Sequence, residues 1–316
     1  EISFVGNRTR NLINGGALAN VNNVLPGAMF GDPTGDANRY RPMPQWQELR
    51  VLRHDLYSNY NSLQASLAKQ TGRINYTLAY TWGKAMGIIN NDLNPFDRDA
   101  AYGPLGSDRT HVLSATYVID LPGLAGDANA FARGVVNGWV LSGIVQAYSG
   151  VNIQPNTTNA NFNLNAPSAQ AGNQLNGAWI LGTTAIRAMP RLTCDPRSNL
   201  GENQFVNGAC FAPPVAGVNG QPGENGAYVM PYMRGPAYFN GDLSLFKEFS
   251  ITESKRIQFR AQAYNFMNHP VRSFLSGDPN LSLNFNAQGG NTNPRFGFAD
   301  NKVGRRTIML GIKFFF

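Results

Sequence analysis

The residues of this chain that could carry chemistry are few and lie far apart. Two cysteines, Cys194 and Cys210, are close to each other in a polar stretch. A structural metal site needs four ligands, so the pair favours a single disulfide bond in an oxidising compartment, with free thiols as the alternative. We expect such a bond to stabilise the segment that contains it, because it closes a ring in the chain.

Acidic and imidazole side chains form no standard metal-binding pattern. A small acidic cluster occurs at Asp92, Asp97 and Asp99. Oxygen-rich loops can bind calcium, but this spacing matches no standard calcium loop and favours a solvated turn. The three histidines fall on separate segments and would have to converge to bind zinc, which favours structural roles: they are His54, His111 and His269.

The sequence also contains no motif typical of an enzyme. It has no Gly-x-Ser-x-Gly elbow, no His-Glu-x-x-His and no phosphate-binding loop. A hydrolase whose serine and histidine lie on different strands is the alternative, but no residue pattern supports it. We therefore predict no enzymatic activity, no catalytic residue, no bound metal and no cofactor.

Composition limits the class of protein. Charged residues make up only 14% of the chain, and no run of apolar residues is long enough for a helical membrane span. Low charge, 11% aromatic residues and 34 glycines suit a β-barrel, in which alternate strand residues are apolar. A soluble β-sandwich with polar loops is the alternative. The net charge of +7 is scattered along the chain, which argues against a nucleic-acid partner.

Alternation of apolar and polar residues recurs about eight times along the chain. The clearest case sets Ile74, Tyr76 and Leu78 against Arg73 and Asn75. Most of these segments are long for a globular protein but suit tilted membrane-spanning strands. The predicted strands cover 1–6, 56–69, 72–86, 109–121, 137–150, 238–251, 255–268 and 303–316.

The connections between these strands alternate between long and short. Long ones cover 10–50, 87–108, 151–237 and 269–302, whereas 70–72, 122–136 and 252–254 are shorter. Outer-membrane barrels have this asymmetry, with short periplasmic turns and long extracellular loops. The pattern predicts an all-β, antiparallel transmembrane β-barrel in the outer membrane of a Gram-negative bacterium, with 1–316 as a single barrel region in contact with lipid.

The C-terminal strand ends on three phenylalanines. A soluble protein rarely ends this way, because nothing would cover the rings, whereas a membrane strand places aromatic residues at the interface. Gly311, Phe314 and Phe316 resemble the C-terminal signal by which bacterial outer-membrane barrels are recognised for insertion. This resemblance implies the barrel-assembly machinery as a partner. Met309 departs from it, because the signal usually has a polar residue there.

Several segments resemble the C-terminal barrel of TonB-dependent outer-membrane receptors of the Oar-like group. The strongest is Phe259–Pro270. Each segment alone is weakly specific, but together they cover nearly the whole chain in the expected order. The others are Ser58–Gln64, Tyr80–Lys84, Asp108–His111, Asp120–Pro122, Gly138–Ile144, Cys194–Pro196, Cys210–Pro213, Leu245–Phe249 and Phe296–Gly297.

This resemblance implies an energised transporter that takes up or exports an unknown substrate. Such receptors have about 22 strands, a plug inside the barrel and a segment that binds the TonB complex. The chain supplies about eight strands and begins inside a predicted strand at Glu1. We therefore expect a C-terminal part of a receptor, which would contact the TonB complex through a plug that this sequence lacks. The alternative is a complete eight-stranded barrel with a structural or adhesive surface role.

Polar strand residues would then face the lumen or hold the plug by hydrogen bonds, or would simply be solvated there. The candidates are Arg73, Asn75, Gln146, Gln258, Arg260 and Gln262. The 151–237 loop is the best candidate for substrate contact, because a connection of this length is usually functional or disordered.

Overall fold

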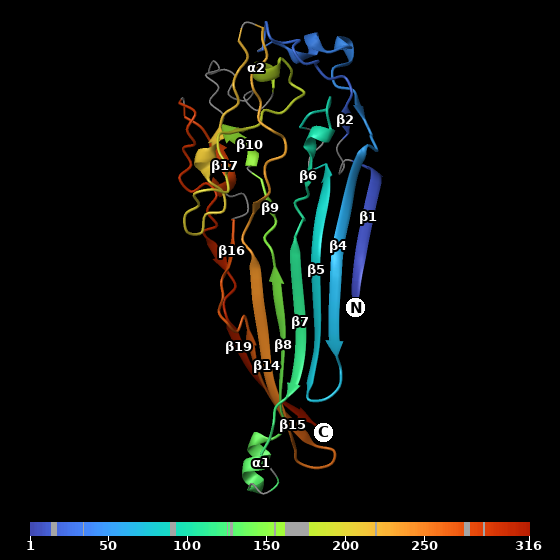
Figure 1. Cartoon of the computed structure of the whole chain (residues 1–316), viewed down its shortest axis with the longest axis vertical. Coiled ribbons are helices and arrows are strands. Elements are labelled where there is room, and N and C mark those ends of the chain that lie inside the picture. The colour runs from blue at the N-terminus through green and yellow to red at the C-terminus, as the bar shows by residue number, and fades with distance from the viewer. Residues whose placement is uncertain are drawn as a thin grey trace.

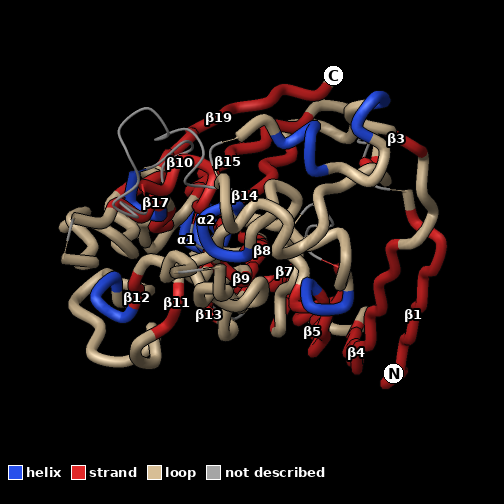
Figure 2. The backbone as a smooth tube through the Cα atoms, turned by 90° about the horizontal axis from the view of Figure 1, so that it is seen from above, coloured by secondary structure: helices blue, strands red, loops and turns tan. Residues whose placement is uncertain are grey.

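A computed structural model of the chain describes residues 1–13, 18–33, 35–88, 93–124, 126, 129–154, 156–161, 177–218, 220–274, 279–286 and 288–316. Its main feature is one tall, antiparallel, 9-stranded sheet. The strand order is β1-β4-β5-β7-β8-β14-β15-β19, and β6 pairs with β5. Seen from above, the sheet curves but does not close (Figure 2). The predicted antiparallel architecture is confirmed.

Each of the eight predicted strands corresponds to one long strand of the sheet. Only the ends differ from prediction. The strand predicted at 255–268 stops at Tyr264, because Asn265 and Asn268 have positive φ angles of 48° and 51°, which end an extended strand. The strands are β1 (Ile2–Leu12), β4 (Leu56–Lys69), β5 (Ile74–Ile88), β7 (His111–Asp120), β8 (Trp139–Tyr148), β14 (Tyr238–Ser250), β15 (Arg256–Tyr264) and β19 (Thr307–Phe315), with the short β6 (Tyr102–Pro104) beside β5.

The register separates the two faces of the sheet. Ile257 pairs with Phe314 and Ala261 with Leu310, so apolar side chains continue from strand to strand on one face. These side chains are uncovered: Leu310 is 71% exposed and Ile312 is 77% exposed. In water such a face would be unstable, whereas in a bilayer it contacts acyl chains.

The buried hydrophobic core lies in the connections at one end of the sheet, not between the strands. Side chains from three long connections meet there, among them Leu93, Ile180, Phe211 and Phe296. A second, smaller cluster joins Val24 and Met29 of the first connection to Ala178 of the 151–237 connection. The loops therefore form a folded cap at the upper end of the sheet (Figure 1).

The cap contains short secondary-structure elements. Its strand pairs are β2 (Ala19–Asn20) with β3 (Arg50–Val51), β9 (Asn152–Ile153) with β13 (Met233–Arg234), β10 (Asn156–Asn161) with β17 (Ser282–Asn284), β11 (Arg191–Leu192) with β12 (Phe211–Ala212), and β16 (Val271–Ser273) with β18 (Asn301–Val303). Its described residues also include helix α2 (Ala178–Leu181) and 3-10 helices at Ala37–Tyr40, Pro44–Trp46, Asp99–Ala101, Gly208–Cys210 and Pro279–Leu281.

The opposite end of the sheet has short connections. A tight turn joins β4 to β5, and Gly72 takes the positive φ angle of 82° that the turn requires. The helix α1 (Ala130–Val136) lies in the connection between β7 and β8 (Figure 1). Among the described residues, no helix is both long and apolar enough to cross a membrane.

Candidate functional site

The six residues predicted to face a lumen all lie on the polar face of the sheet. The register joins them in rows that run across the strands, each row pairing one residue with its neighbour on the next strand. One row is Asn75–Val118–Ser142–Ser244–Gln262, and the next is Asp120–Val140–Phe246–Arg260, which Arg73 extends at the edge of β5. Gln146 lies further up, between Ser114 and Asn240.

A chain of polar side chains runs along β14 and β15 on this face. Gln258 donates from Nε2 to Glu248 Oε1 at 2.8 Å, and Arg260 donates from Nε to Gln258 Oε1 at 2.6 Å. Arg256 reaches the other oxygen of Glu248 at 3.2 Å. Gln258 is almost fully buried by these neighbours. The side chains are therefore held in fixed positions, as a binding surface requires.

Next to this chain, the polar face is hollowed and partly apolar. The hollow has a volume of about 470 Å³ and is lined by Val118, Ile144, Phe246, Arg260 and Tyr264, among others. The Arg260 guanidinium lies 5.7 Å from the centre of the Phe246 ring. Val118 is 42% exposed and Ile144 is 47% exposed. The surface thus combines a fixed cation with uncovered apolar side chains.

Of the six residues predicted to face a lumen, the structure brings only some close together. Gln258, Arg260 and Gln262 share β15, whereas Asn75 makes a local hydrogen bond to the Gly72 carbonyl oxygen at 3.1 Å. The lumen-facing residues predicted from the sequence do not include Glu248, although Glu248 accepts the hydrogen bonds from Gln258 and Arg256. The signal that could have identified it is the short β14–β15 connection, because a tight hairpin fixes which residues face each other and pairs Glu248 with Gln258.

The 151–237 connection, predicted as the substrate-contacting loop, is folded over its described residues. Cys194 and Cys210 form a disulfide bond with 4.9 Å between their Cα atoms. It lies beside the β11–β12 pair, where Thr193 N–H donates to the Cys210 carbonyl at 2.9 Å. The connection also contacts the first loop, because the buried Thr183 hydroxyl donates to the Val24 carbonyl at 2.5 Å. Its described residues therefore form a folded surface rather than a structureless link.

Next to the disulfide, Asp195 and Arg197 form an exposed two-pronged ion pair. Arg197 donates from Nε to Asp195 Oδ1 and from Nη2 to Oδ2, both at 2.9 Å. The side-chain hydrogen bond from Arg197, followed by the one from its backbone N–H, lowers the pKa of Asp195 to about 2. The carboxylate consequently stays charged at any physiological pH.

The remaining polar candidates have structural partners. Asp99 accepts a hydrogen bond from the Tyr57 hydroxyl at 2.8 Å, and Asp97 accepts one from the Ala100 N–H at 3.2 Å. Asp92 lies outside the described residues. His111 Nδ1 lies 2.8 Å from the Tyr80 hydroxyl. Over the part of the chain that the structure describes, His, Cys, Asp and Glu side chains nowhere gather in a group of three that could hold a metal ion.

Comparison with known proteins agrees with this architecture. Residues 1–308 match a family model described as an outer membrane beta barrel domain. No curated protein and no solved structure matches the chain.

Proposed function

This chain belongs to the outer membrane beta barrel domain family, and we propose that it forms part of the wall of a TonB-dependent transporter. Family membership points to the outer membrane of a Gram-negative bacterium. In this proposal the apolar face contacts lipid, the polar face lines the lumen and the folded cap lies outside the cell. Transport is energised through the TonB complex, and the barrel-assembly machinery inserts the chain.

The observation that carries the proposal is the mixed character of the polar face. A water-filled pore wall would be polar throughout, but here Val118, Ile144 and Met309 are between 42% and 52% exposed beside the fixed Arg260. Apolar side chains next to a held cation are typical of a surface that contacts folded protein. A plug domain inside the barrel would cover them, which supports a receptor over an open pore.

The open edges of the sheet support the same proposal. Within the described residues, no strand pairs with the outer edge of β1 or of β19. A strand edge exposed to lipid leaves backbone groups without hydrogen bonds, so a membrane barrel has to close. We propose that further strands complete the wall, which gives a barrel wide enough to hold a plug.

The folded cap supports substrate binding outside the cell. Its core joins three connections, the disulfide closes a ring within the 151–237 connection, and the Thr183–Val24 hydrogen bond ties that connection to the first one. Preorganised loops bind a ligand with a smaller loss of conformational entropy than flexible ones. In this account the protein is a transporter without a cofactor or catalytic residue, and the chemical class of its substrate is open.

The experiment that tests this function needs no knowledge of the substrate. Gln262→Cys places a thiol on the polar face, and an impermeant maleimide is added to intact cells. A plugged transporter predicts slow labelling that changes when the TonB complex is deleted. Val218→Cys, in the cap and 66% exposed, is the control and should label rapidly in both strains. Rapid labelling of Gln262→Cys that is indifferent to TonB would favour an open or purely structural barrel.

A further inference from the structure

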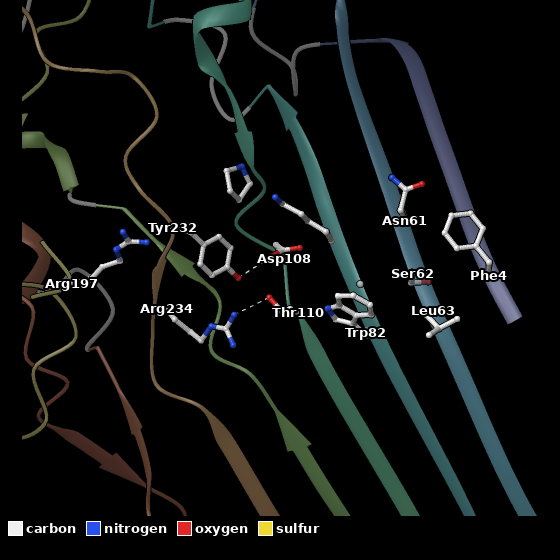
Figure 3. A pocket seen from close by; sticks show the side chains of 13 residues that line it. Phe4, Asn61, Ser62, Leu63, Trp82, Asp108, Thr110, Arg197, Tyr232 and Arg234 are labelled. Carbon is white, nitrogen blue, oxygen red and sulfur yellow. Dashed lines mark hydrogen bonds between the residues drawn. The ribbon is translucent and has the colours of Figure 1, made fainter. Parts of the chain in front are cut away.

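A cavity of about 830 Å³ opens on the apolar face of the sheet, below the cap (Figure 3). Its apolar wall consists of Phe4, Leu63 and Trp82, which are cross-strand neighbours on β1, β4 and β5. Their side chains are 72%, 42% and 56% exposed. Because they continue the apolar face, this wall belongs to the surface that contacts acyl chains.

The cavity lies where the apolar face ends. Above Trp82 the next residue on the same face is Lys84, and above Leu63 it is Asn61, which pairs with Lys84. From Ile74 to Trp82 the strand rises about 20 Å, given about 3.3 Å per residue and a tilt of about 40°. This is close to the apolar height of an outer-membrane barrel, so Trp82 lies at the outer interface, where amphipathic rings are favoured.

Three cations also line the cavity. Lys84 comes from β5, and Arg234 and Arg197 come from the 151–237 connection. Arg234 donates from Nη2 to the Thr110 hydroxyl at 3.2 Å, and its guanidinium lies 5.6 Å from the centre of the Tyr232 ring. Among the described side chains, neither Lys84 nor Arg234 has a carboxylate in ion-pair contact, whereas Arg197 is paired with Asp195.

The carboxylate beside these cations, Asp108, already has hydrogen-bond donors from within the chain. Asp108 is 2% exposed and accepts hydrogen bonds from the Ala85 N–H at 2.6 Å and from the Tyr232 hydroxyl at 2.8 Å. Burial is the main reason why the pKa of Tyr232 is raised, so this hydroxyl remains a donor at neutral pH. Lys84 and Arg234 are therefore available to an anion from outside the chain.

We propose that this cavity binds a phosphate-bearing lipid of the outer leaflet. The phosphate group lies between Lys84 and Arg234, and an acyl chain runs down over Trp82, Leu63 and Phe4. A lipid contacts both parts of the cavity at once. Its headgroup forms charge-assisted hydrogen bonds with the cations, and its acyl chain covers the apolar side chains within the bilayer. A soluble anion would make no use of the apolar wall. The site is distinct from the polar face and does not depend on the transport proposal.

The test uses the full chain purified in dodecyl maltoside, with native mass spectrometry to measure binding of diphosphoryl lipid A. We expect one tightly retained lipid for each chain. The double variant Lys84→Gln/Arg234→Gln should bind about a hundredfold more weakly, which corresponds to about tenfold for each charge-assisted contact. The control Lys302→Gln/Arg305→Gln removes two exposed cations elsewhere and should bind like the unsubstituted protein.

Two further measurements need no variant, so the proposal can fail even where a substitution prevents folding. Chemically dephosphorylated lipid A should bind about as weakly as diphosphoryl lipid A binds to the double variant, and millimolar inorganic phosphate should not displace the bound lipid. Equal binding of the dephosphorylated lipid would show ordinary acyl contact and overturn the proposal. Displacement by inorganic phosphate would identify a site for soluble anions, which also contradicts it. Unchanged lipid binding by a folded double variant would also contradict the proposal.

Discussion

At the scale of single residues, Lys247 is a buried cation on the apolar face. It is 3% exposed and lies between Trp139 and Phe249, with its ammonium 5.8 Å and 4.7 Å from their ring centres. Its Nζ donates to the carbonyl oxygens of Gly134, Val135 and Asn137, at the C-terminal end of α1. The lysine is tolerated beside lipid because the negative end of a helix satisfies its charge.

We therefore predict that Lys247→Met releases α1 from the sheet. The substitution removes a charge-assisted interaction of about 1–3 kcal/mol and leaves the helix held mainly by the hydrogen bond from Trp139 Nε1 to the Val135 carbonyl. Hydrogen exchange of residues 130–136 should become faster by tenfold or more. Lys255→Met, in an exposed turn, is the matched control. Unchanged exchange in Lys247→Met would show that the lysine does not anchor the helix.

The ion pair between Asp195 and Arg197 can be tested by titrating the Asp195 carboxyl. Arg197 holds the pKa of Asp195 at about 2, below its ordinary value of 3.8. Because the folded-state pKa is lowered, the stabilisation is present above pH 3.8 and is lost as the pH falls through about 2. Carbon-13 NMR of the Asp195 carboxyl should show this midpoint, and Arg197→Gln should return it towards 3.8. A midpoint near 3.8 in the unsubstituted protein would show that the pair does not form in solution.

At the scale of elements, the strands were predictable and the loops were not. A strand between lipid and water must alternate with a period of two, so local sequence is enough to locate β5 or β15. The cap depends on contacts between distant residues, such as Thr183 with Val24, which no local pattern announces. Glu248 was missed for a different reason, because its role follows from its register opposite Gln258, which the short β14–β15 hairpin sets.

The cap also yields a prediction at the scale of elements. Replacing both Cys194 and Cys210 with serine should destabilise the surrounding loop by about 3 kcal/mol, because an opened chain gains conformational entropy in the unfolded state. Limited proteolysis of intact cells should then cut within 191–212 much faster, while the sheet stays intact. Reduction of the unsubstituted protein should have the same effect. If the double variant resists protease as well as the unsubstituted protein does, other contacts hold this loop.

At the scale of the whole molecule, the two faces of the sheet have different surroundings. This explains why the hydrophobic core lies in the cap, while apolar strand residues such as Ile308 and Ile312 remain uncovered. Bilayer lipid supplies the packing that a second sheet would supply in a soluble sandwich. The sequence pattern could predict this arrangement, but it could not show where the cap would fold or which polar residues would meet.

Substitutions at two neighbouring residues of β19 test whether the two faces of the sheet have different surroundings. Leu310 lies on the apolar face and Met309 on the polar face, and both are more than half exposed. Leu310→Arg should destabilise the barrel by about 2–4 kcal/mol, because it places a charge in lipid, whereas Met309→Arg should cost much less. Urea unfolding in lipid vesicles, followed on a heat-modifiable gel, measures both. Equal costs for the two variants would be inconsistent with lipid on one face alone.

The most direct measurement is a spin-label scan of β19 in lipid bilayers, one label at a time from Thr307 to Phe315. We predict that labels at Ile308, Leu310, Ile312 and Phe314 collide mainly with oxygen dissolved in the lipid. Labels at Thr307, Met309, Gly311 and Lys313 should instead be more accessible to a water-soluble nickel reagent than their lipid-facing neighbours. A scan without this two-residue period, or with the two faces reversed, would contradict the claim that this sheet is a membrane wall.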